Sequence, residues 1–307
     1  MSAEHPIIAI TGSSGSGINE VTRAFNHMLW KLDARGVFIE GNAFHRYDRA
    51  TMQQELDKAA REGRQLSHYG PEGNMLDKLD SLFFEYAATG SGMSRHYLHT
   101  QAQADKYGQP VGTFTPWKET EKDTDLLLYK GLHGAAVVDD IDIGIYPDLL
   151  IGMVPNVNLE WIRKIQRDTN ERGYTASQVR ESILRRMPDY VAHITPQFSR
   201  THINFQTLSS IDTSDPFNQE RFPTQEECFV VIHNQKNVIP NFHRMVYEIP
   251  DSFMSRPDSL VIPGGKLMLA LERMLMPLIG DLIERSRELR EQPIDARRGE
   301  AGLVGMT

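Results

Sequence analysis

Short apolar runs alternate along the chain with longer segments in which apolar residues recur every three or four positions. The short runs predict strands at residues 7–11, 37–40, 125–129, 149–154, 229–232 and 259–262. The longer segments predict helices at residues 20–34, 49–62, 75–89, 158–171, 176–187 and 266–288. Because strands that alternate with helices are typical of a covered parallel sheet, we expect an α/β fold with a mixed, mainly parallel sheet and helices on both faces.

The segments between these elements predict the organisation of the chain. We expect a single domain over residues 1–291, with Pro277 kinking the last helix. Residues 63–74 and 89–124 are long, polar and rich in Gly, His and aromatic residues, which is typical of lids or substrate loops. Residues 292–307 lack periodicity and are expected to be disordered.

Composition narrows the class of protein. A hydrophobic content of 40% with 24% charged residues is ordinary for a globular chain, and a net charge of −8 argues against a nucleic-acid partner. Cys228 is the only cysteine, which excludes an intrachain disulfide and favours a reducing compartment. No signal peptide and no run of about 18 apolar residues is present, so we expect a cytoplasmic protein with no membrane contact.

The first predicted strand leads into a glycine-rich turn before a helix, the context of a phosphate-binding loop. The two outer glycines have the five-residue offset of the Walker motif, but Ile18 and Asn19 replace its Lys and its Ser or Thr. Backbone N–H groups can still cradle an anion there. The predicted nucleotide-binding residues are Gly12, Ser13, Ser14, Gly15, Ser16, Gly17, Ile18 and Asn19.

The turn after the second strand carries charged residues that are expected to face this loop, since ligands bind at the carboxyl ends of parallel strands. His45, Arg46 and Arg49 predict cationic donors for a phosphate, although a solvated charged turn would give the same pattern. A general base for a substrate hydroxyl would be an acidic residue here. The chain has Asn42, which cannot accept that proton.

The strand at 125–129 runs into Lys130, where a P-loop enzyme would carry an acidic magnesium anchor. Two interpretations remain open. Lys130 can neutralise a bound anion in the metal's place, or it can pair with Glu20 across a site that no longer binds nucleotide. We favour the ion pair. The sequence therefore predicts no metal ligand at this position.

The helix at 158–171 places Lys164, Arg167 and Asp168 on one face by helical spacing, with Arg172 just beyond it. A charged face is often simply solvated. Together with Tyr97 and His99 of the 89–124 segment, it instead suggests a sugar-phosphate pocket.

Several long strings resemble the bacterial phosphoribulokinase family, from about residue 6 to 285. They are TGSSGSG (11–17), IEGNAFHRYDR (39–49), RHYLH (95–99), GTFTPW (112–117), GLHG (131–134), VNLEWIRKIQRD (157–168), RGY (172–174), ITPQFSRTHINFQ (194–206), DTSDPF (212–217) and SFMSR (252–256). The resemblance implies an adenylate-kinase-like P-loop fold, ATP and Mg²⁺ as cofactors, ribulose 5-phosphate as substrate and a homo-oligomer.

Matching the family's motifs to this chain gives two groups of positions. The residues that the resemblance assigns to the substrate are retained, whereas those that it assigns to catalysis and to the metal are substituted. The positions for ribulose 5-phosphate are His45, Arg49, Tyr97, His99, Lys164, Arg167 and Arg172, and Asp168 also matches. The family's magnesium-ligating hydroxyl is replaced by Asn19, its catalytic aspartate by Asn42 and its acidic strand-end residue by Lys130. Lys31 and His233 replace basic residues of the family's effector site, which argues against its allosteric control.

We interpret the chain as a catalytically impaired paralogue that binds sugar phosphate, either alone or as a regulatory subunit mixed with an intact homologue. ATP and Mg²⁺ binding are both in doubt on this interpretation. The alternative is an active kinase in which Lys130 replaces the charge of the metal and His45 or Asp168 acts as base. A third interpretation, engineered residues at positions 42 and 130, fits the run Ile18-Asn19-Glu20 less well.

Overall fold

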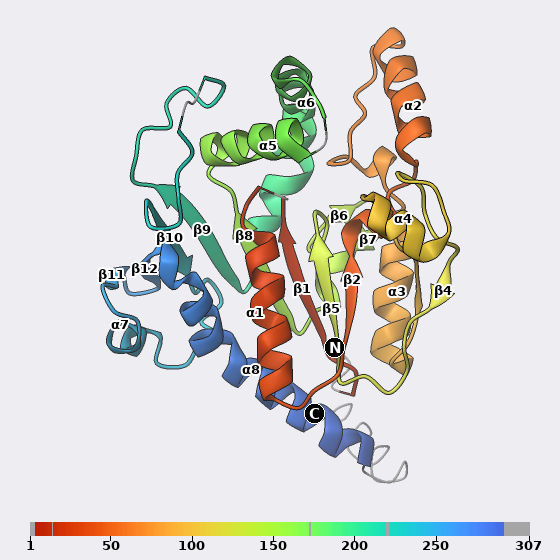
Figure 1. The fold of residues 1–307 in the computed structure, drawn as a ribbon. Coiled ribbons are helices and arrows are strands. Elements are labelled where there is room, and N and C mark those ends of the chain that lie inside the picture. The colour runs from red at the N-terminus through yellow and green to blue at the C-terminus, as the bar shows by residue number, and fades with distance from the viewer. Residues whose placement is uncertain (1–3, 14, 172, 219–220, 292–307) are drawn as a thin grey trace.

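The computed structural model describes residues 4–13, 15–171, 173–218 and 221–291. Ser14, Arg172, the side chain of Asn19 and the predicted disordered tail lie outside the described part. An eight-stranded sheet in the order β11-β12-β10-β9-β8-β1-β5-β2 forms the centre of the molecule (Figure 1).

Five neighbouring strands of the sheet run parallel: β9 (Ile203–Ser209), β8 (Leu149–Val154), β1 (Ile7–Gly12), β5 (Leu126–Gly131) and β2 (Gly36–Glu40). The remaining three, β10 (Cys228–His233), β12 (Ser259–Pro263) and β11 (Phe253–Arg256), extend it by antiparallel pairing. The predicted mixed, mainly parallel sheet is therefore confirmed.

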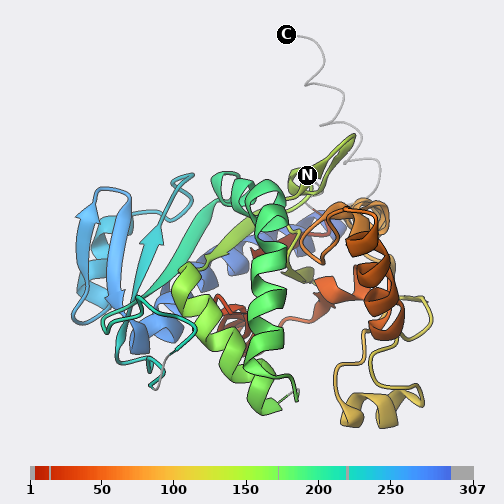
Figure 2. The same ribbon diagram turned by 90° about the horizontal axis from the view of Figure 1, so that it is seen from above.

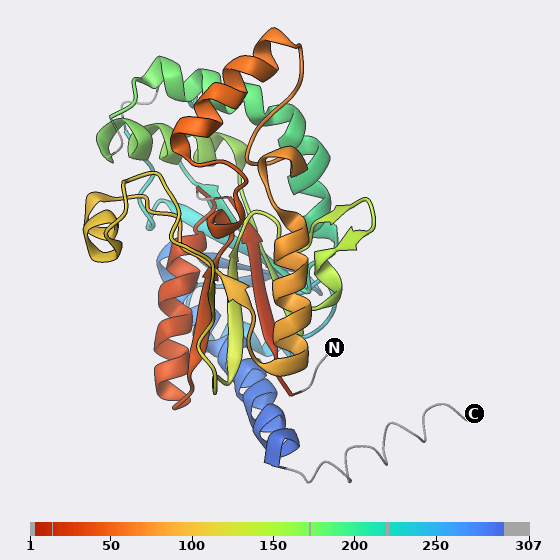
Figure 3. The ribbon, with the colours of Figure 1, turned by 90° about the vertical axis from the view of Figure 1, so that its right-hand side faces the viewer.

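Alternate residues of β1 face two separate cores, which explains its unbroken apolar run. Ile8 and Ile10 pack with α1 (Ile18–Lys31) and α8 (Leu267–Glu291), whereas Ile7 and Ala9 pack with α3 (Leu76–Thr89). Figure 3 shows the sheet between α1 and α3, so helices cover both faces as predicted.

Three further helices lie beyond the carboxyl ends of the parallel strands. They are α2 (Arg49–Arg61), α5 (Val157–Glu171) and α6 (Ala176–Asp189). Seen from above, α5 and α6 lie next to each other, and α2 is set apart from both (Figure 2). Among the described helices, none is both long and apolar enough to cross a membrane.

The remaining elements are short. The two segments predicted as loops contain η2 (Pro71–Gly73), β3 (Met93–Ser94), α4 (Gln101–Tyr107) and β4 (Lys118–Glu119). Later in the chain lie β6 (Val137–Val138), β7 (Ile141–Asp142) and α7 (Met245–Glu248). The last helix begins and ends within three residues of its predicted bounds and contains Pro277.

Candidate functional site

The glycine-rich turn joins β1 to α1 as predicted. Gly17 caps α1 in the left-handed region, at φ 94°, and as a glycine it makes no side-chain hydrogen bond to the first turn of the helix. A Cβ at Gly12 would lie 2.6 Å from the carbonyl oxygen of Met153, so only glycine allows β8 to pack so closely. The uncapped helix N-terminus keeps the N–H donors that an anion needs.

Ile18, at the Walker lysine position, does not face this anion site. Its side chain is 4% exposed and packs in the core between the sheet, α1 and α8. Ile18 is therefore a core residue, and its substitution carries little information about ligand binding.

The turn after β2 is η1 (Gly41–Phe44), and the half-buried Arg95 fixes its position. Arg95 donates from Nε to the carbonyl oxygen of Ala43 at 2.8 Å and from Nη2 to that of His45 at 2.7 Å. These two hydrogen bonds hold the 89–124 segment against η1. The guanidinium also lies 3.6 Å from the ring centre of Phe114, a cation–π contact within that segment.

This attachment brings the predicted substrate residues together. Asn42 Nδ2 contacts His99 Nε2, and the rings of Tyr97 and His99 pack at 4.7 Å. Tyr97 also packs edge-on to His45 at 6.2 Å. Arg49 begins α2, and its N–H donates to the carbonyl oxygen of Gly112 at 2.8 Å.

Asn42 Oδ1 is buried and has no hydrogen-bond partner in the described part of the chain. An unpartnered buried acceptor costs free energy unless a ligand or water supplies the hydrogen. The turn therefore presents an acceptor, but an amide oxygen cannot take a proton as a carboxylate does.

Lys130, at the end of β5, pairs with Glu40, with Nζ 3.1 Å from Oε1. The two residues are direct neighbours in the parallel register of β2 and β5. The expected pairing with Glu20 is wrong, since among the described ion pairs Glu20 is joined to Arg23 at 3.8 Å. Strand register, which the sequence does not reveal, decides the partner.

On α5 the cations converge on one carboxylate rather than pointing into solvent. Lys164 Nζ contacts Asp168, and Arg167 Nε donates to Asp168 Oδ1 at 2.9 Å. Burial alone would raise the pKa of Asp168, but the charges of Lys164 and Arg167 hold it below its usual range. Burial and the charge of Arg186 lower the pKa of Lys164 to about 8.

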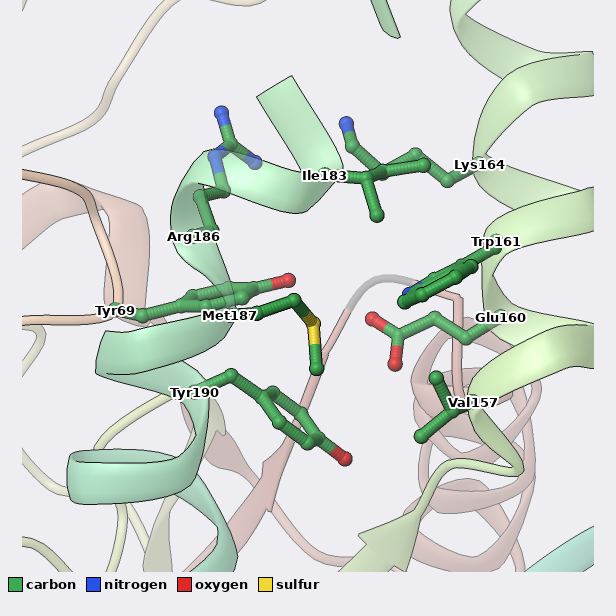
Figure 4. Close-up of a pocket in the computed structure, with 9 residues that line it drawn as sticks. All are labelled: Tyr69, Val157, Glu160, Trp161, Lys164, Ile183, Arg186, Met187 and Tyr190. Atoms are coloured by element: carbon green, nitrogen blue, oxygen red, sulfur yellow. The ribbon is translucent and has the colours of Figure 1, made fainter. Parts of the chain in front are cut away.

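A cavity of about 10 Å³, at the lower limit of the free space that one water molecule needs, lies between α5 and α6. Figure 4 shows the Glu160 carboxylate and the Tyr69 ring pointing into it from opposite walls, with Lys164 and Arg186 above. Glu160 also packs on the glycine loop, where its Cγ lies 2.6 Å from a Cβ placed at Gly15. Burial raises the pKa of Glu160.

The turn after β2 carries less positive charge than the sequence predicts. Burial lowers the pKa of His45 to about 4, so His45 is neutral near pH 7. Arg46 donates to the backbone oxygens of Glu72 and Asn74 at 3.1 and 2.8 Å. The prediction that His45 is a cationic donor is therefore wrong, because burial removes its charge.

Sequence reasoning missed several residues that build this site. They are Tyr69, His68, Asn74, Arg95, Glu160 and Arg186. His68 and Asn74 lie in a polar segment whose contacts are set by tertiary structure. Glu160 could have been predicted from its place in the string VNLEWIRKIQRD. It is the acidic residue in the first turn of α5, and it packs against the glycine-rich loop.

The two predicted effector positions lie on other elements. Lys31 ends α1 and pairs with Glu272 of α8, and His233 ends β10, 3.7 Å from Asp258. Among the described residues, no group of three or more His, Cys, Asp or Glu side chains is arranged to hold a metal ion.

Comparisons with known proteins agree on one family. The family model described as "Phosphoribulokinase / Uridine kinase family" matches residues 7–214. The protein "Phosphoribulokinase, chromosomal" of Cupriavidus necator is 49% identical over 290 residues, which is 94% of this chain and 99% of that protein. "Probable phosphoribulokinase" of Escherichia coli is 45% identical over 284 residues, 92% of this chain and 98% of that protein.

A solved structure gives the same result. The phosphoribulokinase from Rhodobacter spheroides superposes with a TM-score of 0.85 at 43% identity, covering 93% of this chain and 100% of that one.

Proposed function

Because the chain belongs to the phosphoribulokinase and uridine kinase family, we propose that it binds a sugar phosphate such as ribulose 5-phosphate and transfers phosphate poorly. The observation that carries the proposal is a division within one site. Lys164 and Arg167 converge on Asp168 at one side, whereas Asn42 and Lys130 replace the expected acidic groups at the other.

The substrate side supports binding of an anion. Lys164 is 8% exposed, and its ammonium lies among polar groups of α5 and α6. A buried cation that already has a carboxylate partner is held in place before a phosphate arrives, which reduces the entropy cost of binding. Arg49 and Tyr97 lie at the turn after β2, where Arg49 Nη2 donates to the carbonyl oxygen of His99 at 3.5 Å and Tyr97 packs on His45.

The catalytic side supports a loss of turnover. Asn42 lacks a basic group, and loss of a general base typically lowers a rate by about 10²–10⁴-fold. The Lys130 ammonium, paired to Glu40, repels a divalent cation placed beside it. Asn42 keeps the shape of an aspartate, so the fold tolerates the change.

Family membership implies ATP and Mg²⁺ as cofactors of its kinases, and the two fit this chain differently. The glycine loop and the uncapped N-terminus of α1 suit the phosphates of a nucleotide. Mg²⁺ prefers carboxylate oxygens in a near-octahedral shell, and the ammonium of Lys130 does not fit it. We therefore propose weak, metal-independent binding of ATP at most.

A steady-state assay with ATP, Mg²⁺ and ribulose 5-phosphate tests the proposal. We expect turnover far below that of an ordinary kinase. A value of roughly 1–100 per second would contradict it.

The alternative is an active kinase in which Lys130 supplies the charge of the metal. The position of Lys130 at the strand end, with its side chain 19% exposed, favours this version over an inert one. It requires activity that persists in a chelator and disappears in Lys130→Ala.

We also propose a homo-oligomer, or a mixed oligomer with an intact homologue, for which co-purification is the test.

Affinity for ribulose 5-phosphate is expected to fall as pH rises through about 8. The pKa of Lys164 is lowered to about 8, so its ammonium is lost there, whereas an ordinary lysine stays charged. The phosphate itself titrates near pH 6, below this window. Calorimetry across the window measures the effect, and Lys164→Arg, which stays charged, is the matched control. An unchanged affinity in the parent chain would contradict the assignment.

A further inference from the structure

Asn74, buried at 1% exposure just after η2, fixes the orientation of its own amide group. Its Nδ2 donates to the carbonyl oxygens of His68 at 3.0 Å and of Gly70 at 2.7 Å. Both amide hydrogens are thus used, so the remaining atom, Oδ1, faces His45 Nδ1 at 2.9 Å. Because a carbonyl oxygen only accepts, His45 Nδ1 must carry the proton.

This contact decides what His45 offers to a ligand. A neutral imidazole has one N–H, so with the proton on Nδ1 its Nε2 is an acceptor. His45 stays neutral near pH 7, because burial lowers its pKa to about 4.

The charged and titratable groups around His45 come from several elements. His68 stacks on it with ring centres 3.9 Å apart, and Tyr97 packs on its edge. The charges of His133, His99 and Arg186 oppose its protonation, whereas the hydrogen bond to Asn74 favours it. These surroundings keep His45 neutral, so that its Nε2 stays a hydrogen-bond acceptor.

A second acceptor lies on the same turn. Asn42 uses Nδ2 toward His99, and its buried Oδ1 has no partner among the described residues. A phosphate dianion carries only acceptor oxygens, so two acceptors disfavour it. Sugar hydroxyls carry hydrogens to donate, and they fit both atoms.

The two cations that share Asp168 lie elsewhere in the site. Lys164 and Arg167 belong to α5, which is set apart from α2 (Figure 2). The site therefore has two acceptors at η1 and its buried cation at α5, while the exposed Arg49 begins α2 next to η1. This separation matches the two ends of a sugar phosphate.

We propose that Asn74 is a positioning residue that holds His45 as a hydrogen-bond acceptor, so that the turn after β2 binds hydroxyl groups of the sugar and not its phosphate. The inference rests on the proposed function, since it concerns the same ligand. It makes the site selective for a polyhydroxy phosphate over a simple phosphate.

Nitrogen NMR of the histidine rings tests the role of Asn74 in the full-length chain. At neutral pH we expect His45 to be protonated at Nδ1 and unprotonated at Nε2, with the signal assigned by its loss in His45→Gln. Asn74→Ala should give a mixture of tautomers at His45 while exposed His243 is unchanged. Protonation at Nε2 in the unmutated chain would overturn the proposal, even if Asn74→Ala fails to fold.

Calorimetry with two probes tests the ligand. His45→Phe keeps a ring against His68 but loses the acceptor, so affinity for ribulose 5-phosphate should fall about tenfold while affinity for inorganic phosphate stays within about twofold. Equal losses for both probes would overturn the proposal and leave the proposed function standing. If the unmutated chain does not bind ribulose 5-phosphate, the proposed function fails, and this inference fails with it.

Discussion

The triple variant Asn19→Ser, Asn42→Asp, Lys130→Glu is expected to gain phosphoryl transfer to ribulose 5-phosphate by about 10²-fold or more over the unmutated chain. It restores a base at η1 and oxygen ligands for Mg²⁺ beside the glycine loop. Groups that act as one catalytic unit do not contribute additively, so each single change should recover much less.

The structure gives a reason for combining the changes. Lys130→Glu places a carboxylate opposite Glu40, its neighbour in the strand register. Two adjacent carboxylates repel each other, and a divalent cation relieves that repulsion. Without Asn42→Asp the site would regain the metal but not the base.

The steady-state rate with ATP, Mg²⁺ and ribulose 5-phosphate measures this gain. Lys130→Gln is the matched control, since it removes the ammonium and adds no carboxylate. Ile18→Thr should bring no gain either, because Ile18 lies in the core. A triple variant that binds both substrates but stays inactive would show that the loss of activity lies outside these three positions.

Lys164→Met is expected to weaken binding of ribulose 5-phosphate by about 10–100-fold, the range for losing a hydrogen bond from a charged group. Methionine keeps the length of the side chain, but the ammonium that reaches Asp168 is lost. Asp168, 4% exposed, then keeps Arg167 as a charged neighbour. Its negative charge is no longer balanced by Lys164, so it repels the incoming phosphate.

Calorimetry at pH 7 checks this loss, with circular dichroism to confirm that the variant is folded. Lys122→Met is the control, because the side chain of Lys122 is 63% exposed and pairs only at the surface with Glu119. Equal affinities of Lys164→Met and the unmutated chain would place the phosphate away from α5.

The central strands were predictable because burial on both faces leaves an unbroken apolar run, as in Ile7–Gly12. The strand β9 was not predicted, since Ile203–Ser209 alternates and is easily taken for part of a loop. Two-residue strands such as β3 and β6 are too short to leave a pattern.

The candidate site was predictable only where local spacing determines it. Helical spacing brought Lys164 to Asp168, and the glycine offset located the loop at the end of β1. The charge state of His45 and the partner of Lys130 depend on burial and strand register, which are tertiary properties. Asn74 was missed for the same reason, since its three side-chain hydrogen bonds link residues 68 and 70 of a polar segment to His45, just after η1.

Calorimetric titration of the unmutated chain with ribulose 5-phosphate, and separately with ATP in the presence and absence of Mg²⁺, tests the proposed division of the site most directly. We expect binding of the sugar phosphate, with ATP binding that is weak or undetectable and unaffected by Mg²⁺. Tight, magnesium-dependent binding of ATP would contradict the proposed loss of the metal site.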